Sequence, residues 1–376
     1  MVDQFFSSTL RNTDSRIAPV RHSGRYLLDK NEQSDDLDPV LKKKVLECLM
    51  ETNWNRYPAS DYRDIETRIA QYCGLDAQNI VLSAGSASII TTLLDYFALN
   101  KKKIAITQPS YSLFDYHCKT YNIPYTPWLL TPDLNFDLDH LPQLEPGSVL
   151  IITSPNNPTG NVIQANQLEQ ILISHPDSFI ILDGVYCEFG EEDMTPLVKK
   201  YDNLIVLRSF SKAFPVAGLR LGYLCAAPAT ASIIRKLILQ FSITPFSLIF
   251  AREILFSPKF LSQSRQKVRN IIRERVRIKN LIEKEFNEST IRIFPSQGNF
   301  LLIRIQDHHI FENLMADLMN SGIKVLNTSG FPLLQNSLRV SIGNRHENEI
   351  FLECLRRNIR PFVISNGQLG MSPHMN

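Results

Sequence analysis

The chain has 376 residues, of which 44% are hydrophobic and 21% charged, and its formal net charge is +2. This length is enough for two domains, and the near-neutral charge gives no indication of a nucleic-acid or acidic-membrane partner. The cysteines are scattered, without a Cys-x-x-Cys pair or a close histidine, which argues against a structural zinc site and a disulfide framework. No stretch approaches a membrane span in length, and the N-terminus has no secretory pattern, so we expect a cytoplasmic protein.

The first part of the chain is predicted to hold an arm and two helices. Residues 1 to about 30 are polar and irregular, and we expect them to form the arm. Helical periodicity predicts a helix over 39–50, with Pro39 in its first turn. A second amphipathic helix is predicted over about 61–72, where Gly74 provides the stop.

From residue 79 onward, short apolar strands alternate with helices. Strands rich in isoleucine and valine, separated by helical segments, are typical of a mostly parallel sheet with helices on both faces. We therefore expect an α/β three-layer sandwich. The predicted strands cover 79–83, 103–107, 148–153, 178–183, 204–207 and 221–226.

After about residue 258 the pattern becomes that of a smaller α+β domain. It begins with a long amphipathic helix at 262–286, followed by strands at 291–294, 300–305 and 338–342 and a helix near 310–320. We divide the chain into an N-terminal arm with part of the small domain (1–50), a large cofactor-binding domain (51–260) and a small C-terminal domain (261–376).

The strand at 204–207 leads into a polar stretch that contains one amine, Lys212. A lysine can form a Schiff base with an aldehyde, and Ser209, Ser211 and Arg220 can hold a phosphate. An aldehyde and a phosphate together describe pyridoxal phosphate. Taken alone, however, a Ser-x-x-Lys motif is more often a surface lysine, since short motifs carry a high false-positive risk.

Polar residues follow other predicted strands in the same way. In an open α/β sheet, ligands bind at the carboxyl ends of the strands. Independent structural accidents would not all fall at strand ends, so we expect one common site there. The residues that converge on it are Ser86, Tyr111, Asn157, Asp183 and Lys212.

Asp183 closes an apolar strand, so its carboxylate is expected to be partly buried and paired. Opposite a pyridine nitrogen it would keep that nitrogen protonated and make the ring an electron sink; a helix N-cap is the alternative. Tyr186 and Asn157 can reach the phenolic oxygen of such a cofactor and stabilise its anion. Tyr111 can stack on the ring, although a half-buried core tyrosine fits nearly as well.

Two further positions suggest anion binding. Ser86 and the Ala87 backbone N–H begin a helix, which is both a natural phosphate site and an ordinary N-cap. Arg339 lies in an apolar strand and needs an anionic partner there. A substrate carboxylate would serve, and so would an internal salt bridge.

Together these motifs resemble the fold-type I pyridoxal-phosphate aminotransferases of class I/II, and most closely the histidinol-phosphate aminotransferase family. The resemblance covers about residues 28–362, and its order and spacing are highly specific. The motifs that carry it are Arg56-Tyr-Pro58, Gly85-Ser86, Pro109-Ser-Tyr111, Ser154-Pro-Asn-Asn-Pro-Thr-Gly160, Asp183-Gly-Val-Tyr186, Ser209-Phe-Ser-Lys212, Gly218-Leu-Arg-Leu-Gly-Tyr223 and Leu338-Arg-Val-Ser-Ile-Gly343.

The resemblance implies an enzyme of amino-acid biosynthesis that passes an amino group from an amino acid to a 2-oxo acid by ping-pong turnover. Lys212 would carry the cofactor and move the proton at the substrate Cα, assisted by Asp183 and Tyr186. The residues implied in holding the cofactor are Ser86, Ala87, Tyr111, Asn157, Asp183, Tyr186, Ser209, Ser211, Lys212, Arg220 and Tyr57.

The resemblance also implies a homodimer, because Tyr57 would reach the cofactor phosphate of the other subunit. Arg339 would bind the substrate carboxylate, and the arm near Asn31 would cover the site. Asn157 and Tyr57 would complete the substrate contacts. No metal, nucleic acid or membrane is implied.

Three departures from the family pattern stand out. Gly85-Ser-Ala-Ser replaces the usual Gly-Ser-Asp-Glu, and Asp183-Gly-Val-Tyr replaces Asp-Glu-Ala-Tyr. Family members often carry an arginine for the substrate phosphate thirteen residues before the Arg339 position, where this chain has Leu326, with Lys324 close by. We therefore expect an unphosphorylated amino-acid substrate.

Two alternatives stay open. Decarboxylases of the threonine-phosphate type use the same cofactor cage and differ in which Cα bond lies perpendicular to the ring. A non-catalytic regulator that binds the cofactor is the second alternative. The intact Lys212, Asp183 and Arg339, and the absence of a DNA-binding appendage, argue against a regulator.

Overall fold

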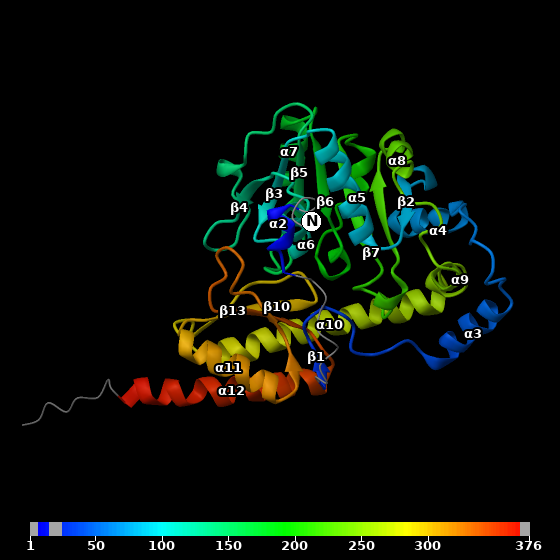
Figure 1. The fold of residues 1–376 in the computed structure, drawn as a ribbon. Coiled ribbons are helices and arrows are strands. Elements are labelled where there is room, and N and C mark those ends of the chain that lie inside the picture. Colours follow the sequence, from blue (N-terminus) through cyan, green and yellow to red (C-terminus); the bar gives the residue numbers. More distant parts are fainter. Residues whose placement is uncertain (1–6, 15–24, 369–376) are drawn as a thin grey trace, which may run out of the picture.

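The computed structural model describes residues 7–14 and 25–368. Its centre is a seven-stranded sheet with the strand order β2-β8-β7-β6-β5-β3-β4 (Figure 1). The strands are β2 (Ile80–Ser83), β3 (Ile104–Gln108), β4 (Thr126–Leu129), β5 (Val149–Thr153), β6 (Phe179–Asp183), β7 (Leu204–Ser209) and β8 (Gly222–Ala226).

The sheet is parallel except at one strand. The pairs from β4 through β3, β5 and β6 to β7 are all parallel, whereas β8 runs antiparallel to both of its neighbours, β2 and β7. The mostly parallel α/β sheet predicted from the periodicity is thus confirmed. The direction of β8 depends on a connection that periodicity does not reveal.

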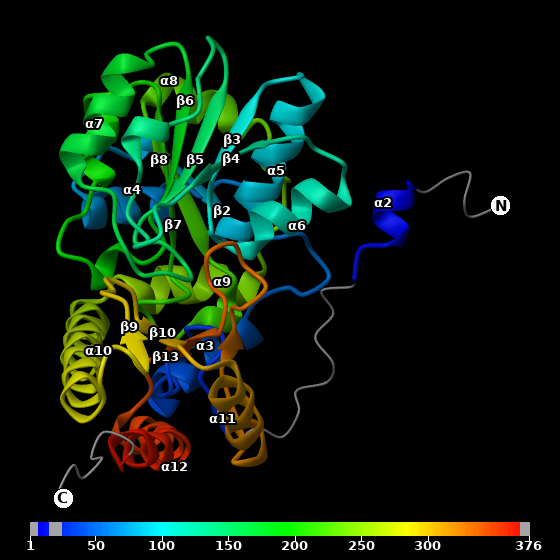
Figure 2. The same ribbon diagram turned by 90° about the vertical axis from the view of Figure 1, so that its left-hand side faces the viewer.

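Helices cover both faces of this sheet, as Figure 2 shows. Alternate strand residues point to opposite faces. Ile181 therefore packs into one cluster with α5 (Ser86–Leu99), α6 (Ser112–Thr120) and α8 (Pro228–Arg235). Its neighbour Ile180 packs into the other, with α4 (Arg63–Cys73), α7 (Ala165–Ser174) and the first half of α10 (Pro258–Glu285).

The second part of the chain forms a four-stranded antiparallel sheet with the order β12-β13-β10-β9. One apolar cluster joins this sheet to the end of α10 and to two further helices. The elements are β9 (Ile291–Ile293), β10 (Phe300–Ile305), α11 (His308–Asn320), β12 (Leu326–Asn327), β13 (Ser337–Ser341) and α12 (Arg345–Gln368).

The N-terminal segment contacts both parts. The short strand β1 (Tyr26–Leu27) pairs in parallel with β11 (Ile323–Lys324). The helix α3 (Pro39–Met50) follows and packs near α9 (Pro245–Phe250), on the side of the large sheet. The domain division at about residues 50 and 260 remains a proposal.

Several element predictions are confirmed with close bounds. The helix α3 begins at Pro39 because Asp38 accepts a hydrogen bond from the Val40 N–H at 2.8 Å, and it ends at Met50. Gly74 ends α4 in the left-handed conformation, at φ +67°. Of the predicted arm, residues 1–6 and 15–24 lie outside the described residues, and 7–14 contain the short helix α2 (Ser8–Arg11).

Within the described ranges, no helix is both long enough and apolar enough to cross a membrane.

Candidate active site

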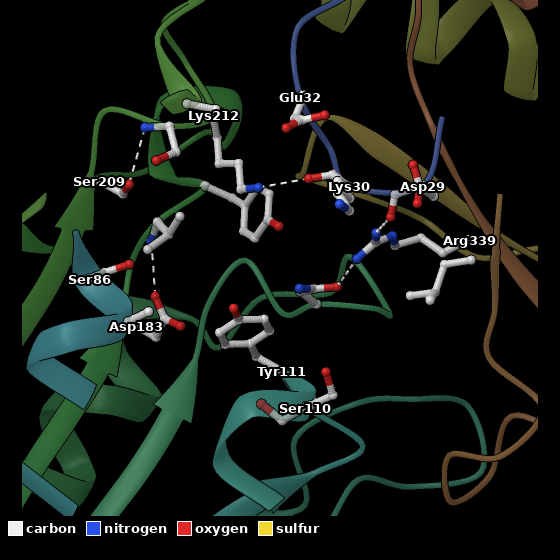
Figure 3. A pocket seen from close by; sticks show the side chains of 18 of the residues that line it. Asp29, Lys30, Glu32, Ser86, Ser110, Tyr111, Asp183, Ser209, Lys212 and Arg339 are labelled. Atoms are coloured by element: carbon white, nitrogen blue, oxygen red, sulfur yellow. Dashed lines mark hydrogen bonds between the residues drawn. The ribbon is translucent and has the colours of Figure 1, made fainter. Parts of the chain in front are cut away.

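A cavity of about 530 Å³ lies where the carboxyl ends of the large sheet meet β13 (Figure 3). The convergence predicted from the strand ends is observed, because residues from eight separate segments line one space. The predicted residues among its lining are Ser86, Ala87, Tyr111, Asn157, Asp183, Tyr186, Ser209, Ser211, Lys212, Arg220 and Arg339.

Lys212 lies in the loop that follows β7 and is half-buried. Its Nζ donates a hydrogen bond to the Lys30 carbonyl oxygen at 2.7 Å, as Figure 3 shows. Burial, with the nearby positive charge of Arg339, lowers the pKa of the amine to about 8. A lysine with such a pKa is neutral in a substantial fraction near physiological pH, and a neutral amine is the form that attacks a carbonyl.

Asp183 is the last residue of β6 and is only 3% exposed. It accepts a hydrogen bond from the Val185 N–H at 3.3 Å. Burial raises the pKa of this carboxyl to about 7. The next helical turn, Cys187–Phe189, has Tyr186 at its N-cap, so Asp183 caps no helix there.

A cradle of polar groups lies between α5 and the loop before β8. The Ser209 Oγ accepts from the Ser211 N–H at 3.1 Å, and Arg220 Nη1 donates to the Ser211 Oγ at 3.5 Å. A Cβ on Gly222 would lie 2.3 Å from the Ser86 nitrogen, so only glycine lets β8 approach the start of α5 this closely. The helix N-terminus and Arg220 together favour an anion.

Arg339 reaches the cavity from β13 and is 4% exposed. Nη1 donates to the Asn157 Oδ1, and Nη2 donates to the Asp29 carbonyl oxygen. Nε is buried without a hydrogen-bond partner. Within the described part of the chain no carboxylate forms an ion pair with Arg339, so the internal salt bridge considered above is not observed, and the guanidinium remains suited to an anionic ligand.

Asn31 orients the site without lining the cavity. Its backbone is left-handed, at φ +55°. Its Nδ2 donates to the Tyr186 hydroxyl at 2.9 Å, and its Oδ1 accepts from the Ser341 hydroxyl at 2.8 Å. Asn31 thus joins the N-terminal segment to β13 and to the loop after β6. Burial raises the pKa of the Tyr186 phenol to about 12.

Tyr57 lies away from the cavity within its own chain. Its side chain is 82% exposed, in the segment between α3 and α4, and it stacks on Phe241 with ring centroids 4.9 Å apart. A single chain therefore offers Tyr57 to solvent, and its predicted contact with a neighbouring subunit stays a prediction.

Sequence reasoning missed several lining residues. Asp29, Lys30 and Glu32 belong to an irregular segment without periodicity, and nothing in the local sequence marks them as part of a site. Ser110 belongs to the Pro109-Ser-Tyr111 motif, which does not predict a separate role for this serine. Phe331 lies in the loop between β12 and β13, and only the tertiary fold brings it to the cavity.

The residues present fit pyridoxal phosphate. The raised pKa of the buried Asp183 carboxyl means that a cation is needed to stabilise its charged form, and a protonated pyridine ring would supply one. The cradle around Ser211 and Arg220 would hold the phosphate, and Lys212 lies in the same cavity.

Comparison with known proteins supports this interpretation. The family model for aminotransferase class I and II matches residues 23–355, which is most of the chain. The chain belongs to the class I and II aminotransferases. It is a pyridoxal-phosphate-dependent aminotransferase with the type I fold, as the sequence motifs predicted.

Individual proteins similar to this chain include the histidinol-phosphate aminotransferases. The histidinol-phosphate aminotransferase of Pyrococcus furiosus is 31% identical over 338 residues, which cover 90% of this chain and 93% of that protein. This aminotransferase is therefore similar to the histidinol-phosphate aminotransferases along nearly its whole length.

Solved structures share the fold. The histidinol-phosphate aminotransferase of Sinorhizobium meliloti, solved in complex with pyridoxal-5′-phosphate, superposes with a TM-score of 0.76 at 20% identity and covers 94% of this chain and 100% of its own. The L-threonine-O-3-phosphate decarboxylase of Porphyromonas gingivalis gives a TM-score of 0.74 at 20% identity and covers 88% and 98%. The fold alone therefore does not separate transamination from decarboxylation.

Proposed function

We propose that this cavity transfers an amino group from an amino-acid donor to a 2-oxo acid in two successive half-reactions. The observation that carries the proposal is the meeting of three groups in one cavity: the Lys212 amine, the buried Asp183 carboxyl and the Arg339 guanidinium. In Figure 3, Asp183 and Arg339 lie on opposite sides of the cavity. A ring held at Asp183 and a substrate carboxylate held at Arg339 would thus face each other across it.

Bound pyridoxal phosphate supplies an electron-poor ring that stabilises negative charge at the substrate Cα. Asp183 would keep the ring nitrogen protonated, since its carboxylate is buried at the end of β6 and benefits from a cation. Tyr111 lines the same cavity and would hold the ring from one face. Tyr186 and Asn157 would donate hydrogen bonds to the phenolic oxygen.

Lys212 would act as the acid and base of the reaction. Its lowered pKa, about 8, lies close to the working pH, which is the condition for efficient proton transfer in both directions. The amine would remove the proton at the substrate Cα and deliver it to the carbon that was the aldehyde of the cofactor, two bonds away. The amine now donates its hydrogen bond to the Lys30 carbonyl oxygen, and both residues line the cavity.

Arg339 would bind the carboxylate of the substrate with its guanidinium. Asn157 and the Asp29 carbonyl oxygen already hold two of its branches, so its orientation is fixed before a substrate arrives. Arg339 is buried, and burial makes a charge-assisted hydrogen bond stronger than on the surface.

We further propose that the enzyme acts as a homodimer in the cytoplasm. The exposed Tyr57 supports the dimer, because an aromatic side chain that is 82% exposed is available to a second subunit. The six cysteines are all free, which suits a reducing compartment.

Steady-state kinetics test the proposed function. With the amino acid and the 2-oxo acid both varied, the ping-pong scheme predicts parallel lines in double-reciprocal plots, whereas intersecting lines would contradict it. We expect Lys212→Ala to reduce turnover by a factor of at least about a thousand. A Lys212→Ala protein that retained its turnover would exclude the role given to this amine.

A further inference from the structure

The strand register places Leu326 beside Arg339. In the antiparallel pair β12–β13 their Cα atoms are direct partners. Directly opposite residues of such a pair point to the same face, with Cβ atoms about 4.5–5.5 Å apart. The two side chains therefore enter the cavity together, and both line it.

Phe331 extends this surface. It lies in the turn after β12, where its N–H donates to the Thr328 carbonyl oxygen at 2.9 Å, and it lines the same cavity. Arg304 of β10 donates a hydrogen bond to the Leu333 carbonyl oxygen, which ties the loop to the sheet. We name the side chains of Leu326 and Phe331 the apolar wall.

Two of the basic residues that line the cavity belong to the cofactor site. Among the described lining residues, the basic ones are Lys30, Lys212, Arg220 and Arg339. Lys212 and Arg220 belong to the cofactor end, and Lys30 is an exposed residue two positions before Glu32, which also lines the cavity.

Lys324 does not replace a cation at the apolar wall. It lies two residues before Leu326, but in the separate strand β11, and its Nζ pairs with the Asp29 carboxylate at 3.2 Å. It is also absent from the residues that line the cavity. A group that lies against Leu326 and Phe331 therefore has no free ammonium or guanidinium from this strand pair besides Arg339.

We propose that the apolar wall binds the side chain of the donor amino acid, so that the substrate class is amino acids with an apolar, unphosphorylated side chain. This rests on the proposed function, in which Arg339 holds the substrate carboxylate next to Leu326. The apolar side chain of the donor would leave water and contact the carbon atoms of Leu326 and Phe331, and this transfer is favourable. Histidinol phosphate carries its phosphate in place of the carboxylate, so this phosphate would lie at Arg339, and the apolar wall would supply no second cation for its second charge.

The first test compares donors in single half-reactions of the holoenzyme without an oxo acid. The probes are L-phenylalanine, L-leucine and histidinol phosphate, and the readout is the rate at which the cofactor absorption changes. We expect L-phenylalanine or L-leucine to exceed histidinol phosphate by at least about tenfold in the ratio of rate to half-saturating concentration. A preference for histidinol phosphate would overturn the inference while leaving the proposed transfer intact.

Two variants of the wall sharpen the comparison. Leu326→Arg places a cation in the wall. We expect it to change the preference between L-phenylalanine and histidinol phosphate by about tenfold or more in favour of histidinol phosphate. Leu326→Met, which keeps an apolar side chain of similar volume, is the matched control and should leave the ratio nearly unchanged. If Leu326→Arg retains its cofactor absorption and the ratio does not move, the inference is wrong.

A binding measurement works without turnover. Calorimetric titration of the holoenzyme with 3-phenylpropanoate, a carboxylate with an apolar side chain and no amino group, should show binding that Phe331→Ala weakens by about tenfold. Equal binding to both proteins would overturn the inference. If no donor reacts but 3-phenylpropanoate binds in this pattern, the proposed transfer fails and the apolar wall stands.

Discussion

At the scale of single residues, the cavity holds two titratable groups whose pKa values burial moves toward each other. The pKa of the Asp183 carboxyl rises to about 7 and that of the Lys212 amine falls to about 8. Burial disfavours the charged form of each group, which explains both directions. The protein without its cofactor therefore holds an unfavourable carboxylate at the position where a cationic ring would stabilise it.

The Asp183→Asn variant tests this carboxyl through stability. The folded-state pKa is raised above the unfolded one, so the contribution of Asp183 is most favourable below about pH 4 and declines as the pH rises to about 7. At pH 8 the cofactor-free variant should be more stable than the wild type by up to about 4 kcal/mol, at roughly 1.4 kcal/mol per pKa unit.

Urea unfolding of both cofactor-free proteins at pH 4 and pH 8 measures the difference. We expect the difference in the free energy of unfolding between the variant and the wild type to grow as the pH rises. The same substitution should slow turnover of the holoenzyme, since an amide cannot stabilise a pyridinium as a carboxylate does. If this difference in the free energy of unfolding is the same at both pH values, Asp183 is not the buried group described here.

Arg339→Lys tests the recognition of the substrate carboxylate. A lysine keeps the charge but loses the planar fork, and it can no longer donate to Asn157, to the Asp29 carbonyl and to a ligand in the same geometry. We expect KM for the amino acid to rise about 10–100-fold, with a smaller change in kcat. Lys279→Arg, at an exposed pair with Glu283 on α10, is a matched control that should leave KM unchanged.

At the scale of elements, the strand ends position the site and the glycines allow the close approaches. β8 lies against the first turn of α5 because Gly222 has no side chain. β13 separates two environments by simple alternation: Ser337, Arg339 and Ser341 face the site side, while Leu338 and Val340 enter the apolar cluster under α11 and α12.

Gly222→Ala is therefore expected to weaken the cofactor site. Its Cβ would meet the Ser86 backbone nitrogen at 2.3 Å, so the start of α5 must move and the phosphate cradle with it. We expect the affinity for pyridoxal phosphate to fall by at least about tenfold, by analogy with other displaced anion sites. Gly330→Ala, whose Cβ would meet nothing within 4 Å, is the control. Unchanged affinity in Gly222→Ala would contradict the described packing.

Much of the arrangement of helices and strands could be predicted from the sequence. The apolar strands and the polar residues at their ends predicted the sheet and most of the cavity, since both depend on local pattern. β4 was not predicted, because Pro127 interrupts a strand whose residues are mostly exposed. α12, which is 24 residues long, was also not predicted.

Links between distant segments were beyond the reach of sequence patterns. The hydrogen bond from Asn31 to Tyr186 joins residues 155 apart, and the bond from Ser341 to Asn31 spans 310 residues. The same holds for Arg339 and Asn157, each of which was predicted as a site residue but not as a pair. Periodicity predicts which face of a helix or strand a residue occupies. Which distant residue lies opposite that face depends on the folded chain.

At the scale of the whole molecule, the account predicts that two chains share each site. We expect a cofactor-free Lys212→Ala chain and a Tyr57→Ala chain, mixed, refolded together and loaded with cofactor, to recover activity that neither has alone. Random pairing gives hybrids in about half of the dimers, with one intact site each, so about a quarter of wild-type activity should return. Activity no higher than the sum of the separate variants would contradict a shared site.

The central claim is that this cavity transfers the amino group of its substrate, and the products of a single half-reaction test it most directly. Holoenzyme would be incubated with an excess of one amino acid in the absence of any oxo acid, and the products analysed by mass spectrometry. The account predicts one equivalent of the matching 2-oxo acid per site and no carbon dioxide. An amine and carbon dioxide, formed over many turnovers, would contradict transamination and show a decarboxylase on the same fold.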